Sequence, residues 1–234
     1  MIAQVTERRM TMMAHANIMD FRGPGKATVE DALRGVWKGF IDSIAGIDKA
    51  GYQSQAEMSS VLNDNLILMH SLLMSTASYR ELVNSSYRRL TRTKYWGWKP
   101  VYEDDLGKVG LFSIYRSAEV PLHDHPGTHG VLMVVEGELD VERFTLKEKY
   151  RQSNESGMVE LDRYDHQTLK PFDVTWFGPE EGNLHRMKAI TEQCVLLQVH
   201  LPKSGSDRSW YFPIFSTEQH QDSIMARRIM SRYL

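Results

Sequence analysis

Three histidines in this sequence have the spacing of a metal-binding site. His123 and His125 are separated by one residue in the run Pro-Leu-His-Asp-His-Pro-Gly that starts at Pro121. Side chains alternate along an extended segment, so both imidazoles are expected on one face and Asp124 on the other. A third, His185, ends the run Gly-Asn-Leu-His before a new apolar stretch. Three neutral imidazoles leave coordination positions open, as a catalytic metal requires, so the pattern predicts a mononuclear metal enzyme.

The residues after position 100 have the pattern of a β-protein. Short apolar runs bounded by turn residues predict strands at 109–115, 131–135, 139–146, 158–161, 174–177, 187–190, 195–201 and 210–215. No helical pattern of comparable strength separates these runs. Many short strands at regular spacing indicate a sandwich or a closed barrel, within which the histidines would be held.

The two ends of the chain have helical patterns instead. Apolar residues three and four apart predict helices over 28–44 and 61–90, so residues 1–100 are expected to form a helical region that packs on the barrel. The aromatic and proline-containing run 95–101 breaks this pattern and predicts a junction. At the other end, the spacing of Ile224, Ile229 and Met230 predicts a short helix within 217–234, with Arg227 and Arg228 on its solvated face.

Composition excludes several classes of protein. The 234 residues carry a formal net charge of -2, which gives no reason to expect nucleic acid or an acidic membrane surface as a partner. Cys194 is the only cysteine, so no intramolecular disulfide can form and a reducing compartment is expected. The sequence has no signal-like start and no apolar run of the roughly 20 residues that cross a bilayer. We therefore expect a cytoplasmic protein.

The β-region resembles the cupin fold in the form used by thiol dioxygenases, the family of cysteine dioxygenase, cysteamine dioxygenase and the plant cysteine oxidases. The run 121–139 resembles the first cupin motif, and 182–190 resembles the second. The similarity spans 102–216 and is greatest to the cysteamine and plant enzymes. It implies a mainly β fold: a cupin barrel (double-stranded β-helix or jelly roll) over 101–216, with the helical N-terminal region before it and the short C-terminal helix after it.

The resemblance also implies a ligand set. His123, His125 and His185 would bind Fe²⁺, whereas most cupins add a glutamate at the position that Gly130 occupies here. An all-histidine ferrous site is more positive than one with a carboxylate, and this favours an incoming thiolate. Such a site can pass both atoms of O2 to the sulfur and give a sulfinic acid. The implied partners are a small thiol, or an N-terminal cysteinyl thiol, and O2.

Two further residues are candidates for a catalytic role. His200 matches a histidine behind the ligands of cysteine dioxygenases, and Tyr211 resembles a tyrosine near the C-terminal end of the cysteamine-type enzymes. Cysteine dioxygenases place a carboxylate-binding arginine soon after a tyrosine, but acidic residues surround Tyr102 here and Arg116 is the only arginine nearby. This departure disfavours free cysteine and favours an aminothiol or an N-terminal cysteinyl group.

Alternatives remain at this point. Another metal-dependent cupin, such as a carbon-substrate oxygenase or an isomerase, is disfavoured by Gly130. A non-catalytic ligand-sensing cupin is disfavoured by the complete histidine trio. Three imidazoles also accept nickel, copper or zinc, so the sequence does not establish iron. The N-terminal region has two candidate roles, covering the barrel mouth or forming a homodimer interface.

Overall fold

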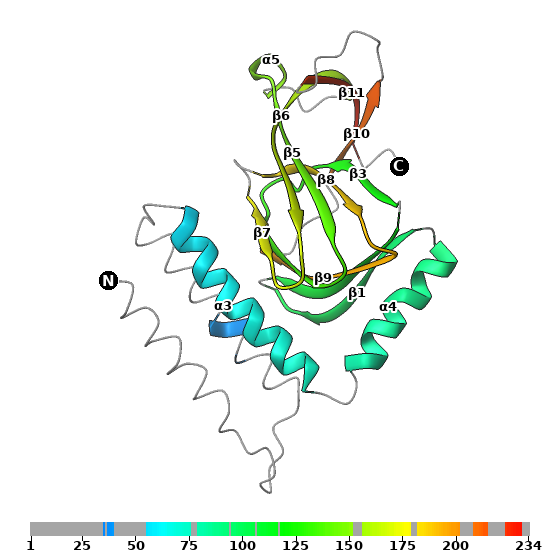
Figure 1. Cartoon of the computed structure of the whole chain (residues 1–234). Helices are drawn as coiled ribbons and strands as arrows, with labels where there is room; N and C mark the ends of the chain where they lie inside the picture. Colours follow the sequence, from blue (N-terminus) through cyan, green and yellow to red (C-terminus); the bar gives the residue numbers. More distant parts are fainter. Residues whose placement is uncertain are drawn as a thin grey trace, which may run out of the picture.

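The structure is a computed structural model. It describes residues 35, 37–39, 55–75, 79–93, 95–105, 107–116, 118–151, 156–178, 182–201, 208–214 and 223–230. Two helices, α3 (Gln55–Met74) and α4 (Tyr79–Thr93), precede the strands and lie beneath them in Figure 1. Residues 35 and 37–39 are also helical, and the rest of the helix predicted over 28–44 lies outside the described residues.

The strands form two layers. The first is a five-stranded antiparallel sheet in the order β1 (Trp96–Glu103), β2 (Lys108–Tyr115), β9 (Gln193–Leu201), β4 (His129–Glu136) and β7 (Val174–Phe177). The second is a closed ring in the order β10 (Ser209–Ile214), β11 (Ser223–Met230), β6 (Gly157–Leu169), β5 (Leu139–Leu146), β8 (Leu184–Ala189) and β3 (Glu119–His123). The one-turn helix α5 (Glu148–Arg151) connects β5 to β6. This architecture confirms the predicted mainly β cupin barrel.

The five-stranded sheet is buried on both faces, and strand β9 shows why. One face packs against the ring in a core that includes Leu196 of β9 and Met187 of β8. The other face packs against α3, where Leu66 lies in the same cluster as Leu197. Every residue of β9 after the first is buried, so this strand has a continuous apolar run rather than the alternation of a half-solvated strand. Helix α3 therefore packs on the face of the sheet that is turned away from the ring.

The C-terminal helix is a wrong prediction for residues 223–230, which form strand β11. This strand pairs with β10 on one edge and β6 on the other. Its side chains alternate, because Ala226 and Arg228 are buried whereas Arg227 between them is exposed. The spacing of the apolar residues in this segment is compatible with either a helix or a strand. Hydrogen-bonded pairing on both edges favours the strand. Arg228 is consequently buried rather than solvated.

The junction predicted at 95–101 is also a strand. The helical region ends before Tyr95, which has a positive φ of 68°, and β1 starts at Trp96. Strand β1 lies at the edge of its sheet, where Pro100 is tolerated because its missing N–H costs no ladder bond. The register of β1 against β2 shifts between Pro100 and Tyr102. The β-structure therefore begins before the predicted boundary at residue 101.

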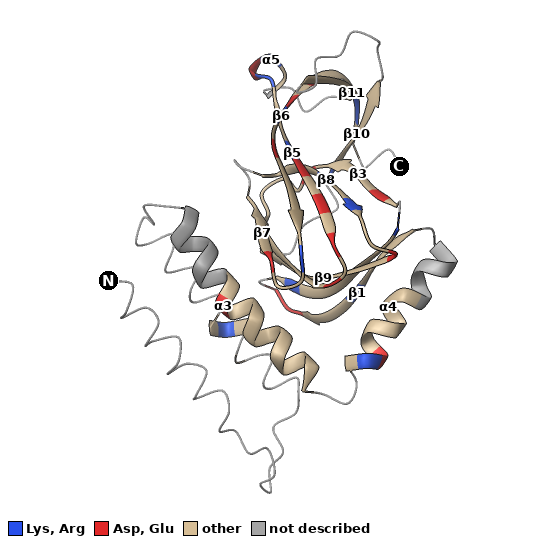
Figure 2. Cartoon of the chain, viewed as in Figure 1, with Lys and Arg blue, Asp and Glu red and all other residues tan. Residues whose placement is uncertain are grey.

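Charged residues on the ring are paired across strands. Figure 2 shows acidic and basic segments interspersed on β5 and β8. Arg163 Nη1 of β6 lies 2.9 Å from Glu142 Oε1 of β5, and Arg186 of β8 contacts the other oxygen of the same carboxylate. These cations lower the pKa of Glu142, although its partial burial opposes them.

Candidate metal centre

Neighbouring strands of the ring bring the three histidines together. His123 ends β3 and lies directly opposite His185 of β8 in the antiparallel register. His125 follows β3, and its backbone N–H donates to Asn183 Oδ1 at 2.6 Å, which ties the loop to the start of β8. All three side chains are buried. The alternation along the chain thus puts His123 and His125 on one face, as the sequence predicted.

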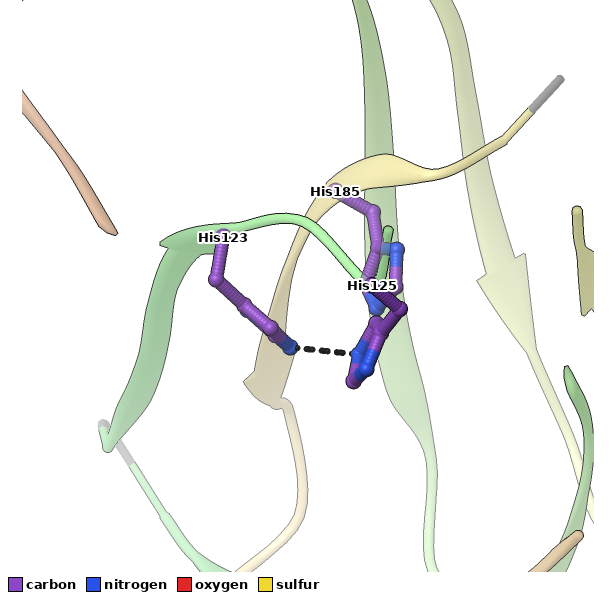
Figure 3. A group of neighbouring side chains, drawn as sticks. All are labelled: His123, His125 and His185. Atoms are coloured by element: carbon purple, nitrogen blue, oxygen red, sulfur yellow. Dashed lines mark hydrogen bonds between the residues drawn. The ribbon is translucent and has the colours of Figure 1, made fainter. Parts of the chain in front are cut away.

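The imidazoles converge on one point, as Figure 3 shows. One ring nitrogen from each histidine lies within 4.8 Å of the others, and no other group of this kind occurs among the described residues. The Nε2 atoms of His123 and His125 are 2.9 Å apart. Such a spacing places two lone-pair donors at one position and suits a shared cation.

Hydrogen bonds behind the rings fix which nitrogens face this point. Nδ1 of His123 lies 2.8 Å from the carbonyl oxygen of Pro121, and Nδ1 of His185 lies 3.0 Å from that of Gly182. A carbonyl can only accept, so both Nδ1 atoms carry the proton and both Nε2 atoms present a lone pair. Gly182 has a φ of 69°, in the left-handed region, and its carbonyl is thereby aimed back at His185.

The residues present fit a divalent metal ion. His185 Nε2 is buried and has no hydrogen-bond partner, an arrangement that costs free energy unless something else binds the lone pair. Burial, the largest cause in each case, lowers the pKa of His123 and His125 well below the usual value and that of His185 to about 4. The imidazoles are therefore neutral at physiological pH, which is the state that coordinates a metal.

Phe177 fills the space beside Gly130, the position at which the resemblance implied a glutamate in most cupins. Gly130 of β4 pairs with Phe177 of β7, and a Cβ at Gly130 would lie 1.9 Å from Phe177 Cζ. The Phe177 ring stacks on that of His125, with centroids 4.6 Å apart and planes 24° from parallel. It also lies 5.0 Å from the His185 ring. An aromatic side chain thus closes this side of the site, and position 130 has no room for a carboxylate.

Comparisons with known proteins identify the family. The family model described as PCO_ADO matches residues 62–232, more than half of the chain. The chain belongs to the PCO_ADO family. This membership confirms the resemblance to cupin thiol dioxygenases that the two histidine motifs suggested.

Two relatives of this PCO_ADO chain are named 2-aminoethanethiol dioxygenase. The human protein is 42% identical over 137 residues, covering 47% of this chain and 50% of the human one. The mouse protein is 24% identical over 179 residues, covering 63% of this chain and 68% of the mouse one. The matched part of the chain thus spans about half of the length of the human relative and about two thirds of the length of the mouse relative. A solved structure of a conserved Klebsiella pneumoniae protein with a double-stranded β-helix domain is 19% identical, covers 48% of this chain and 83% of its own, and has a TM-score of 0.36.

His200 lies in the wall of the site and not among the three converging histidines. It stands on β9 opposite Gly130, and its ring centroid is 5.2 Å from that of His125 and 5.6 Å from that of Trp98. Its Nδ1 is buried without a hydrogen-bond partner, and burial lowers its pKa to about 3. The structure therefore brings His200 to the candidate centre as a neutral imidazole.

The hydroxyl of Tyr211 is directed at Asp124. It donates to Asp124 Oδ2 at 2.9 Å. Burial and the Asp124 carboxylate raise the pKa of Tyr211, so the phenol stays protonated. Whether Tyr211 takes part in catalysis stays a prediction at this point.

Two residues near the site of this PCO_ADO chain were missed by the sequence reasoning. The Trp210 ring lies 5.2 Å from that of His123, and the guanidinium carbon of Arg208 lies 5.7 Å from the Trp210 centroid. The positive charge of Arg208 contributes to the lowered pKa of His123, His125 and His185, although burial is the larger cause. The pairing of Trp210 with His123 was not predictable, because it depends on how the ring closes.

The described helices are also informative about membranes. None of them has both the length and the apolar character needed to span a bilayer. The location and the homodimer inferred from the sequence stay predictions.

Proposed function

We propose that this protein is a mononuclear non-heme iron thiol dioxygenase. It would oxidise a small thiol, or an N-terminal cysteinyl thiol, to a sulfinic acid with O2. The observation that carries the proposal is the buried group of three histidines with Phe177 in place of a carboxylate ligand. Membership of the PCO_ADO family and relatives named 2-aminoethanethiol dioxygenase support a thiol as the substrate.

His123, His125 and His185 would hold Fe²⁺ through their Nε2 atoms. Three imidazoles are a suitable donor set for ferrous iron. When bound, the iron would act as Lewis acid and redox centre for the thiol and O2. The carbonyls of Pro121 and Gly182 hold two of the rings in orientation by accepting from Nδ1, and such partners behind the ligands tune metal affinity.

The surroundings of the site favour a thiolate over a neutral thiol. The three candidate ligands are neutral, so none of them offsets the charge of a bound metal. The Arg208 guanidinium adds a positive charge close enough to perturb all three imidazoles. Phe177 and Trp210 line the histidines with apolar surface, which excludes water and strengthens this attraction. We therefore assign Arg208 to stabilisation of the bound thiolate.

The reaction balances with thiol and O2 alone. Both oxygen atoms form bonds to sulfur, the S–H proton is released, and the sulfinate keeps the carbon skeleton unchanged. The sulfur loses four electrons and O2 gains four, so no other reductant is needed. His200, a neutral imidazole whose ring lies 5.2 Å from that of His125, is the residue we propose to act in catalysis by hydrogen-bonding the substrate, because its low pKa disfavours a role as a proton acceptor.

The substrate is proposed to be an aminothiol or an N-terminal cysteinyl group. The acidic segment after Tyr102 does not offer a carboxylate-binding group. Tyr102 itself packs in the helix-covered core, and Asp104 accepts hydrogen bonds from Trp37 Nε1 at 2.8 Å and from the Gly107 amide at 3.0 Å. This segment therefore has a structural role on the opposite face of the sheet.

Oxygen uptake after anaerobic reconstitution with Fe²⁺ tests the proposal. The thiols to compare are cysteine, cysteamine, 3-mercaptopropionate and a peptide with N-terminal cysteine. We expect uptake with cysteamine or the peptide, matched by a product that has gained two oxygen atoms. Iron-loaded protein that consumes no O2 with any thiol would contradict the proposal and favour a carbon-substrate cupin or a sensor.

Arg208→Gln is expected to raise KM for the oxidised thiol about 5- to 20-fold. In general, two unit charges about 10 Å apart interact by roughly 1–2 kcal/mol at an effective dielectric constant of about 20, and losing an interaction of that size weakens binding by about this factor. Steady-state oxygen uptake measures the effect. Arg227→Gln, which removes an exposed arginine of β11, is the matched control and should leave KM unchanged. Equal KM values for Arg208→Gln and the unsubstituted protein would remove Arg208 from substrate binding.

A further inference from the structure

Asp124 connects the metal-ligand loop to the C-terminal hairpin formed by β10 and β11. It lies between His123 and His125 in the chain, and its carboxylate is bonded to β10. Its Oδ1 accepts from the Ser209 backbone N–H at 2.6 Å, and its Oδ2 accepts from the Tyr211 hydroxyl at 2.9 Å. Its own backbone N–H donates to the Ser209 carbonyl at 3.2 Å. Three hydrogen bonds therefore join one residue of the loop to β10.

The partners of Asp124 are themselves held rigidly. Ser209 and Tyr211 are buried, and Tyr211 packs in the apolar cluster that also contains Leu122, the residue just before His123. Tyr211 lies opposite Arg228 of β11, which is buried as well. The Arg228 guanidinium acts on the Asp124 carboxylate as a favourable charge. The hairpin thus presents a hydroxyl, a backbone amide and a cation to one half-buried carboxylate.

Apart from these hydrogen bonds, the hairpin makes few backbone connections to β3, the strand that carries His123. In the part of the chain that the structure describes, β10 and β3 share a single register pair, Trp210 with His123. Pairing of β3 with β8 is irregular between Val120 and His123. The backbone ladder therefore leaves the segment after His123 weakly constrained. The His125 N–H bond to Asn183 Oδ1 ties it to β8, and the bonds to Asp124 tie it to β10.

We propose that Asp124 and Tyr211 form a latch by which the hairpin sets the spacing of the two ligands His123 and His125. Because successive side chains of an extended segment point to opposite faces, holding Asp124 also holds both flanking imidazoles. Tyr211 is then a positioning residue that acts through Asp124. The inference rests on the proposed metal binding and does not depend on which substrate is oxidised.

Tyr211→Phe tests the latch through metal affinity. This change removes the hydroxyl and keeps the ring in its apolar cluster. We expect Co²⁺, followed by its absorption spectrum in competition with a chelator, to bind about 10- to 100-fold more weakly, as is typical when a partner behind a metal ligand is lost. Tyr150→Phe is the matched control, because Tyr150 packs against the same cluster and is far from the ligands in the chain. It should leave the affinity unchanged.

A double-mutant cycle separates a latch from general damage to the fold. Asp124→Asn keeps the size of the side chain and removes the charge that Ser209, Tyr211 and Arg228 share. If the two residues act as one unit, Asp124→Asn and Tyr211→Phe together weaken Co²⁺ binding no more than the stronger single change. Two fully additive effects would overturn the latch.

Hydrogen exchange in the unsubstituted protein gives an independent test. If the conformation of the hairpin raises metal affinity, then bound metal must in turn stabilise that conformation, because coupling free energy is reciprocal. Co²⁺ should therefore slow exchange of the Ser209 and Tyr211 amides and leave those of β1 unchanged.

The outcomes distinguish this inference from the proposed function. Tyr211→Phe with unchanged Co²⁺ affinity but a lower turnover number would overturn the latch and favour a hydroxyl that acts in the reaction. Tight metal binding that weakens in Tyr211→Phe, in a protein that oxidises no thiol, would support the latch and contradict the proposed function.

Discussion

His185→Ala is expected to abolish metal retention and thiol oxidation together. The imidazole contributes the Nε2 that has no other partner, and it is the only one of the three ligands that comes from β8. The two remaining histidines are two positions apart at the end of β3 and cannot enclose an ion alone. Losing a ligand should weaken binding by more than the roughly 10- to 100-fold typical of changes behind the ligands. Metal content after gel filtration and oxygen uptake measure the two effects.

His166→Ala is the control for this prediction. His166 lies on β6, is about half exposed, and has its Nε2 3.6 Å from Asp140 Oδ1 on the outer side of the ring. Its loss should change neither metal content nor activity. Full activity in His185→Ala would contradict both the ligand assignment and the proposed mechanism. His123→Ala should behave as His185→Ala does.

Gly130→Ala is expected to destabilise the fold strongly for a change of one methyl group. The new Cβ would lie 1.9 Å from Phe177 Cζ and 2.4 Å from both Cε atoms. The ring cannot shift freely, because it is buried and stacked on His125. Overpacking of this kind typically costs about 1–3 kcal/mol of unfolding free energy, and we expect a loss at or beyond the upper end. Urea denaturation of the metal-free protein measures it.

Two companion variants make the test specific. Gly157→Ala, at the start of β6, adds a methyl group where no atom lies within 4 Å, and it should have little effect on stability. Phe177→Leu shortens the side chain that Gly130→Ala would strike. The double variant should therefore be less destabilised than the sum of the single changes. Strict additivity would mean that the two residues do not compete for one space.

The ligands were predictable because they depend on local rules. Strand alternation puts His123 and His125 on one face wherever the segment is extended. His185 was found through its motif and confirmed in place by the antiparallel pairing of β3 with β8. Likewise the strands 139–146 and 174–177 agree with β5 and β7, since apolar runs bounded by turns are a local signal.

The surroundings of the ligands were not predictable for the opposite reason. Phe177, Trp210 and Arg208 meet the histidines only after strands distant in sequence have paired. The wrong C-terminal helix has the same cause, because Ile224 and Ile229 fit a helix until β6 and β10 provide partners on both edges. Arg228 could be recognised as buried only once that pairing was known. Local patterns thus predicted which histidines lie together, and non-local pairing decided what surrounds them.

The latch between Asp124 and Tyr211 has a consequence during protein synthesis. These two residues are 87 positions apart in the chain. At about 5–20 residues per second, a ribosome adds that length in roughly 4–17 s. Throughout this interval the nascent chain carries His123 and His125 without β10, and for most of it without His185. A metal that needs all three histidines and the bonds to Asp124 could therefore bind fully only after β10 has been synthesised.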